Sequence, residues 1–154
     1  MDNGIEFENL NEFLAKLDSI SNEYATTAEK HLRKTGNRLR KTVIAATPDG
    51  SSSDTVISKS GKTRKNRKKL KNSWKGTIKG ESGDTLEYDL RSTAPHFHLV
   101  DRGHVQKTPS GRVTGFVAGK HFFDKAVKEW EATDDVSKEL EKYMQEIKKK
   151  VDDN

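Results

Sequence analysis

Three histidines and one aspartate lie close together in the sequence, and their chemistry is considered first. His96, His98 and His104 fall within nine residues, with Asp101 between them. Imidazole and carboxylate groups are ordinary zinc ligands, and a His-x-His pair on a strand would share one face. The same spacing also arises in histidines that only line a surface or an interface. The sequence leaves both interpretations open.

Motifs for catalysis are weak or missing. The chain has no cysteine, which excludes thiol catalysis and cysteine-based zinc sites. Its serines form no Gly-x-Ser-x-Gly elbow, and it has neither a Walker A loop nor a strand-linked Gly-x-Gly-x-x-Gly. The acidic pair Asp134-Asp135 stands at an expected helix start, where negative charge is favourable in any case. We therefore predict a protein that is not an enzyme and has no cofactor.

A basic run at residues 59–71 is the strongest physical feature of the sequence. The formal net charge is +5, and no acidic residue interrupts the run, so the positive charge is local. Clustered lysine and arginine bind phosphates whatever the base sequence, and the absence of aromatic residues from 48 to 72 argues against base stacking. Contact with DNA, contact with an acidic protein surface and simple solvation all remain open. The basic residues are Lys59, Lys62, Arg64, Lys65, Arg67, Lys68, Lys69 and Lys71.

The composition predicts one domain with a small core. Of 154 residues, 31% are apolar and 34% charged, whereas typical domains are about 45–50% apolar and about 25% charged. Part of the chain is therefore expected to be extended, solvated or ordered only by partners. No apolar run approaches the roughly 20 residues that cross a bilayer, so we expect a soluble chain without a signal peptide or a membrane partner.

The N-terminal third is expected to be mainly helical. Residues 5–7 alternate as in a short strand, and Asn9 can then cap a helix. Apolar residues follow at helical spacing, a second helix is expected to begin at Ser21, and Pro48 ends it. Residues 48–69 contain few apolar side chains and are expected to form a long mobile loop.

A β-hairpin and C-terminal helices are predicted for the remainder. Residues 73–79 and 85–91 alternate apolar and polar side chains around a turn, which is typical of a hairpin. The hairpin should pack through Trp74, Ile78, Leu86, Tyr88 and Leu90. A last helix after Thr133 should carry one apolar face: Val136, Leu140, Tyr143, Met144, Ile147 and Val151.

These elements predict an α+β fold. Long N-terminal helices and C-terminal helices would pack on a small antiparallel sheet, with long polar loops between the elements. The single domain 1–154 would divide into an N-terminal strand and helices (1–47), a basic mobile loop (48–69), an antiparallel sheet with a loop (70–118) and C-terminal helices (119–154).

Residues 94–104 are not explained by periodicity, and they resemble a known signature. Their sequence, Ala-Pro-His-Phe-His-Leu-Val-Asp-Arg-Gly-His, is similar to the Ala-Pro-His-x-His-Leu-(aliphatic)-Glu-x-Gly-His pattern of phage head–tail joining, or tail-completion, proteins. Further matches follow the same order along the chain. Residues 70–74 resemble a Leu-x-x-Ser-Trp strand entry, 111–117 a glycine-punctuated loop, and 118–126 a Pro-Gly-x-x-Phe-(apolar)-x-x-Ala helix start. Asp101 stands where glutamate is usual, and Arg102 where an aromatic residue is common.

The resemblance implies a structural role in the virion neck, after assembly in the host cytoplasm. Members of the family form rings, commonly hexamers, between the head connector and the tail tube, and DNA passes through the lumen. The implied partners are further copies of the chain, a head connector or stopper protein, a tail tube or tail terminator protein, and non-specifically the phage DNA. The candidate assembly loop comprises His98, Asp101, Arg102, Gly103, His104 and Arg112.

Two other functions remain open on the sequence. A small non-specific nucleic-acid-binding protein would use residues 59–71, and its binding would weaken steeply with salt. A small basic ribonuclease is the third hypothesis, although no acid–base pair is placed for it.

Overall fold

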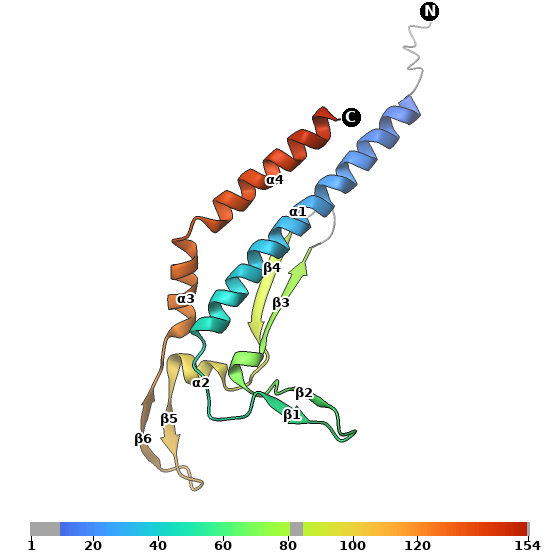
Figure 1. Cartoon of the computed structure of the whole chain (residues 1–154). Coiled ribbons are helices and arrows are strands. Elements are labelled where there is room, and N and C mark those ends of the chain that lie inside the picture. Colours follow the sequence, from blue (N-terminus) through green and yellow to red (C-terminus); the bar gives the residue numbers. More distant parts are fainter. Residues whose placement is uncertain (1–9, 81–84, 154) are drawn as a thin grey trace, which may run out of the picture.

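One long helix, α1 (Leu10–Ala46), runs through most of the length of the molecule (Figure 1). The computed structural model describes residues 10–80 and 85–153, so the expected strand at 5–7 and the cap at Asn9 lie outside it. The predicted start of a second helix at Ser21 is wrong, because α1 continues through that position. Serine and asparagine cost only roughly 0.5 kcal/mol inside a helix, so this cap signal is easily overridden.

The predicted hairpin is confirmed and lies along α1. Strands β3 (Trp74–Lys79) and β4 (Glu87–Ser92) pair antiparallel, with Ile78 opposite Tyr88. The ring of Tyr88 occupies the space where a Cβ on Gly36 of α1 would stand, and Gly76 of β3 leaves room for its hydroxyl. The hydroxyl donates to Oδ1 of Asn37 at 3.1 Å. The absence of a side chain at Gly36 therefore lets the hairpin pack closely against α1.

The core lies where the end of α1 meets the start of β3 and the helices α2 (Phe97–Arg102) and α3 (Phe122–Glu131). The Trp74 ring stacks on Phe123 at 5.5 Å and meets Phe97 edge-on at 5.3 Å. Its Nε1 donates to Oγ1 of Thr47, just beyond the end of α1, at 2.8 Å. This core is small, as the composition predicts. Its buried apolar residues in the described part of the chain are Val43, Leu70, Trp74, Ala94, Phe122 and Ala126.

The α+β class is confirmed, but the strands do not form one sheet. In the described residues they form three separate antiparallel hairpins: β1–β2 (Thr55–Ile57 and Thr63–Lys65), β3–β4, and β5–β6 (Gly103–Lys107 and Val113–Ala118). The first lies in the segment predicted to be a loop, and the third includes much of the polar loop expected after Asp101. Figure 1 shows β1–β2 and β5–β6 extending away from the core.

The last helix, α4 (Asp135–Asp152), packs along α1 and not on a sheet face. The two helices run antiparallel, and the prediction that α4 covers a sheet is wrong. Ion pairs and one aromatic contact join the two helices. No helix in the described part of the chain is long and apolar enough to span a membrane.

Candidate assembly and nucleic-acid interfaces

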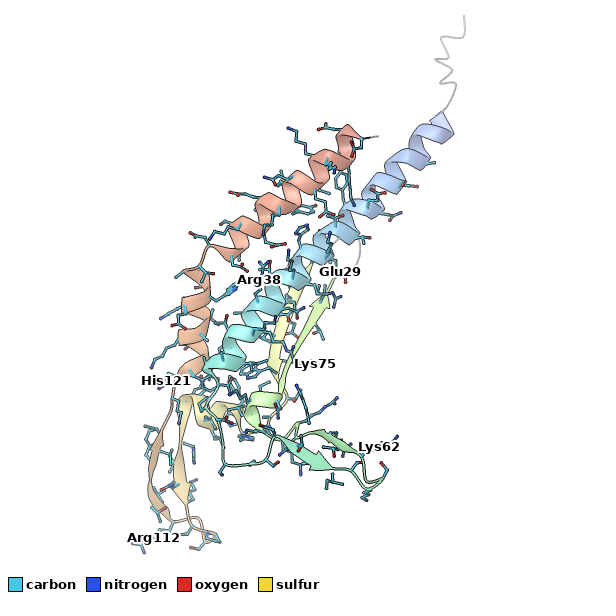
Figure 2. The ribbon with its side chains drawn as sticks, in the orientation of Figure 1. Glu29, Arg38, Lys62, Lys75, Arg112 and His121 are labelled. Carbon is cyan, nitrogen blue, oxygen red and sulfur yellow. The ribbon has the colours of Figure 1, made fainter. Side chains whose placement is uncertain are left out.

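Half of the basic run lies on the β1–β2 hairpin, with Lys62 near its tip, and the rest follows β2 directly (Figure 2). Six of its eight cations are exposed, and none of the six forms an ion pair with another described residue. Both faces of the hairpin are open to solvent, including Ile57. We call this group the basic hairpin: Lys59, Lys62, Arg64, Lys65, Arg67 and Lys68.

The other two cations of the run have a structural role at the base of this hairpin. Lys69 is buried, and its Nζ lies 2.6 Å from a carboxylate oxygen of both Asp49 and Asp54. These hydrogen bonds, that of Asp49 foremost, raise the pKa of Lys69, and the bond from Lys69 lowers the pKa of Asp49. Lys71 lies 3.6 Å from Asp49. Lys69 is therefore held in ion pairs within the fold and is not available to bind a phosphate.

Asp101 in the predicted assembly loop is buried and caps a helix. Its Oδ1 accepts a hydrogen bond from the amide of Phe123 at 3.1 Å, and its carbonyl accepts one from His121 at 2.8 Å. His121, the residue before α3, is left-handed (φ 47°) and offers no side-chain cap of its own. A carboxylate at a helix N-terminus satisfies free amides and complements the helix dipole. Asp101 thus fixes the start of α3 from a distant part of the chain.

Of the remaining members of the assembly loop, some are needed by the fold and others lie on the surface. Gly103 begins β5 with φ 86°, and a Cβ there would press against the carbonyl of Val117. His104 is half-buried, whereas the surface members are His98, Arg102 and Arg112, the last near the tip of β5–β6 (Figure 2). Within the described ranges, no group of three or more histidine, aspartate or glutamate side chains is arranged to hold a metal. The structure therefore does not bring the three histidines and Asp101 together as ligands.

A buried ionic cluster between α1 and α4 was missed by the sequence analysis. Its centre is Glu139, whose side chain is only 2% exposed. Three side chains of α1 reach its carboxylate: His31 at 2.7 Å, Arg38 at 2.9 Å and Lys34 at 3.2 Å. Burial acts to raise the pKa of Glu139, but the three hydrogen bonds outweigh burial and lower that pKa to about 2.

The cluster extends along α4 by one helical turn to Asp135 and by two turns to Glu146. The Nε2 of His31 is 2.9 Å from Glu146, and Nη1 of Arg38 donates to Asp135 at 2.7 Å. Hydrogen bonds, first from His31 and then from Lys30, lower the pKa of Glu146. The sequence carries a signal for this pairing. His31 and Arg38 are seven residues apart, as are Glu139 and Glu146, which places each pair on one helix face.

The comparison with protein families decides the affiliation. The model of the HK97-gp10-like family, described as "Bacteriophage HK97-gp10, putative tail-component", matches residues 11–103, more than half of the chain. The chain belongs to this family. The resemblance to phage neck and tail-completion proteins is therefore confirmed. No curated protein and no solved structure gave a significant match.

The range matched by the HK97-gp10-like family contains both motifs that mark the core of the fold. Residues 70–74 lead into β3 and bring Trp74 into the aromatic cluster, and residues 94–103 form α2 and place Asp101 under α3. The match also includes the basic hairpin but stops before β6, α3 and α4. In this member of the family, the matched range therefore builds the scaffold and one projecting hairpin.

Proposed function

We propose that the chain is a structural adaptor of the virion neck that forms a ring between the head connector and the tail tube. DNA would pass through the lumen of the ring, and the subunits would assemble in the host cytoplasm. The partners are further copies of the chain, a connector or stopper protein, and a tail tube or terminator protein. The adaptor works by docking and catalyses no reaction.

The observation that supports this proposal is the projection of β1–β2 and β5–β6 from a small core in a member of a phage tail-component family. A two-stranded hairpin that buries little of itself is marginal in water. Such hairpins become well ordered when a partner covers them, and contacts between unlike surfaces close into rings when the rotation per subunit permits.

The test is a phage in which the gene is interrupted. Negative-stain images of the lysate should show filled heads and separate tails, and supplying the chain from a plasmid should restore joined virions. Normal joining in the absence of the chain would exclude the adaptor role.

Non-specific binding to double-stranded DNA through the basic hairpin is the second candidate function. It is favoured by six exposed cations without partners in the described chain. Each neutralised phosphate contributes about 0.9 to the slope of log K against log salt, so the wild-type slope should fall sharply when the six are changed to glutamine. The matched control changes six exposed lysines elsewhere: Lys120, Lys125, Lys128, Lys138, Lys148 and Lys149. Equal slopes for the two variants would exclude the basic hairpin as the contact.

A further inference from the structure

Helix α4 carries an apolar stripe that no described part of the chain covers. We call Val136, Leu140, Met144 and Val151 the α4 stripe; Leu140 is 57% and Met144 60% exposed. These residues recur every four or seven positions and share one side of the helix. Glu139 and Glu146 take the side that faces α1. Tyr143 also packs its ring edge-on against His31 of α1, whereas the four residues of the α4 stripe remain exposed.

A second uncovered apolar surface lies on the β5–β6 hairpin. Val105 pairs directly with Phe116, and Lys107 pairs with Val113, so these apolar side chains project from one face. We call Val105, Val113 and Phe116 the hairpin face; Phe116 is 65% exposed. Exposed groups of large apolar side chains mark interaction sites in soluble proteins.

The two surfaces lie at opposite ends of the molecule, so one chain cannot join its own pair (Figure 1). We propose that the hairpin face of one copy docks on the α4 stripe of the next copy. This contact rests on the proposed adaptor ring and supplies its subunit interface. Because the two surfaces differ, the contact is heterologous and can repeat around a ring.

Charge complementarity favours a second copy of the chain as the molecule that covers the α4 stripe. Glu141 borders the stripe on the side away from α1, is exposed, and forms no ion pair with a described residue. With Leu140 and Met144 it lines a shallow hollow. The hairpin brings exposed Lys107 and Arg112 beside its apolar face, and neither has an ion-pair partner in the described chain.

Symmetric pairing of two α4 helices explains the surfaces less well. It would cover the α4 stripe twice but leave Phe116 and its neighbours in water. The head-to-tail contact covers both apolar surfaces and pairs opposite charges.

Cysteine cross-linking tests this geometry directly, because the chain contains no cysteine. Phe116→Cys and Leu140→Cys are prepared separately, mixed and mildly oxidised. Both positions are exposed, so folding should be unaffected. We expect a disulfide-linked dimer in the mixture and little in either variant alone. The control pairs Leu140→Cys with Ile57→Cys on the basic hairpin, which is equally exposed but not part of the contact.

A Leu140–Leu140 product, a Phe116–Phe116 product, or an equal yield with Ile57→Cys would overturn the head-to-tail contact. So would the absence of any mixed product. The second measurement is molar mass by light scattering. Leu140→Ser with Met144→Ser should leave a folded monomer, and Lys138→Ser with Lys149→Ser on another side of α4 should retain the wild-type mass. An unchanged mass in the first variant also overturns the contact.

Failure of this contact and failure of the adaptor role are separable. If heads and tails still require the chain but no mixed disulfide forms, the ring uses another interface and the adaptor role stands. If heads and tails join without the chain, the adaptor role is wrong whatever the cross-linking shows.

Discussion

Nδ1 of His31 lies 2.7 Å from Oε1 of Glu139, across the interface between the first and last helices. The same imidazole reaches Glu146 through Nε2 at 2.9 Å, so each ring nitrogen faces a carboxylate oxygen. One imidazole of α1 therefore joins two acidic residues of α4 that lie seven positions apart. The contact turns Glu139 and Glu146 towards α1 and leaves Leu140 and Met144 exposed.

Replacing Glu139 with glutamine should destabilise the fold by about 2–3 kcal/mol, since it removes the carboxylate that His31, Lys34 and Arg38 share and leaves the two charged side chains of α1 without it. The partly exposed Arg38 and Lys34 keep the cost below that of a fully buried pair. Urea unfolding followed by circular dichroism measures the change. Glu141→Gln is the control, and it should shift stability by less than about 0.5 kcal/mol. Equal effects of the two substitutions would contradict a structural role for the cluster.

Acid should weaken the protein as the pH falls from about 4.5 towards 2. The pKa of Glu139 is 4.5 in the absence of the fold and about 2 within it. Between these values the unfolded chain binds more protons than the folded one, so stability rises with pH through this window and is lost on acidification. The lowered pKa of Glu146 acts in the same direction.

The measurement is the urea midpoint at successive pH values between 6 and 2.5. Glu139→Gln should flatten the curve in the acid range, and Glu141→Gln should keep the wild-type slope. A wild-type midpoint that does not change below pH 4.5 would refute the assignment.

Asp101→Ala should cost about 1–2 kcal/mol, the usual effect of losing a helix N-cap. The loss should be local at first, so hydrogen exchange should accelerate at the amide of Phe123, which donates to this carboxylate. Asp124→Ala, an exposed acid in the first turn of the same helix, is the control, and it should cost only a few tenths of a kcal/mol. Unchanged exchange at Phe123 would show that the cap contributes little.

Gly36→Ala should destabilise the protein by roughly 1–3 kcal/mol, because the added methyl group overlaps the ring of Tyr88. The direction of the stability change is diagnostic, since Gly→Ala at an unconstrained helix position stabilises a protein by up to about 1 kcal/mol. In a Tyr88→Ala background the methyl group has space, and the substitution should become neutral or stabilising. A double-mutant cycle from thermal unfolding measures this coupling, and additive effects would argue against this close packing.

Much of the scaffold was predictable because its signals are local. The period-two alternation before and after residues 80–84 specifies a hairpin and places Ile78 and Tyr88, which pair in the structure, among its apolar positions. The apolar periodicity of α1 and the proline at position 48 place one long helical region, although a cap-like pair at residues 21–22 suggested a break that tertiary packing overrides. The family affiliation also follows from ordered motifs, since residues 70–74 and 94–103 build the core.

The candidate surfaces were only partly predictable. Lys68 and Lys69 are adjacent and alike in sequence, yet one is exposed and the other is buried between Asp49 and Asp54. Within the assembly loop, an aspartate at position 101 is equally compatible in sequence with a contact to a partner and with a cap on α3; the structure shows the cap. In both cases the role depends on which groups the folded chain brings within hydrogen-bond distance.

Sequence by itself determined the element types, the core motifs and the concentration of positive charge. Tertiary structure alone decided which side of α4 is buried. The apolar periodicity of that helix predicts one buried face, and Tyr143 does lie against α1, but Leu140 and Met144 stay exposed while Glu139 is buried. His31 is 108 positions from Glu139, so the matching seven-residue spacings on the two helices acquire their meaning only when the fold brings the helices together. An amphipathic helix buries the side for which the rest of the fold offers matching side chains. Here α1 offers cations, and the apolar side of α4 is left for another molecule.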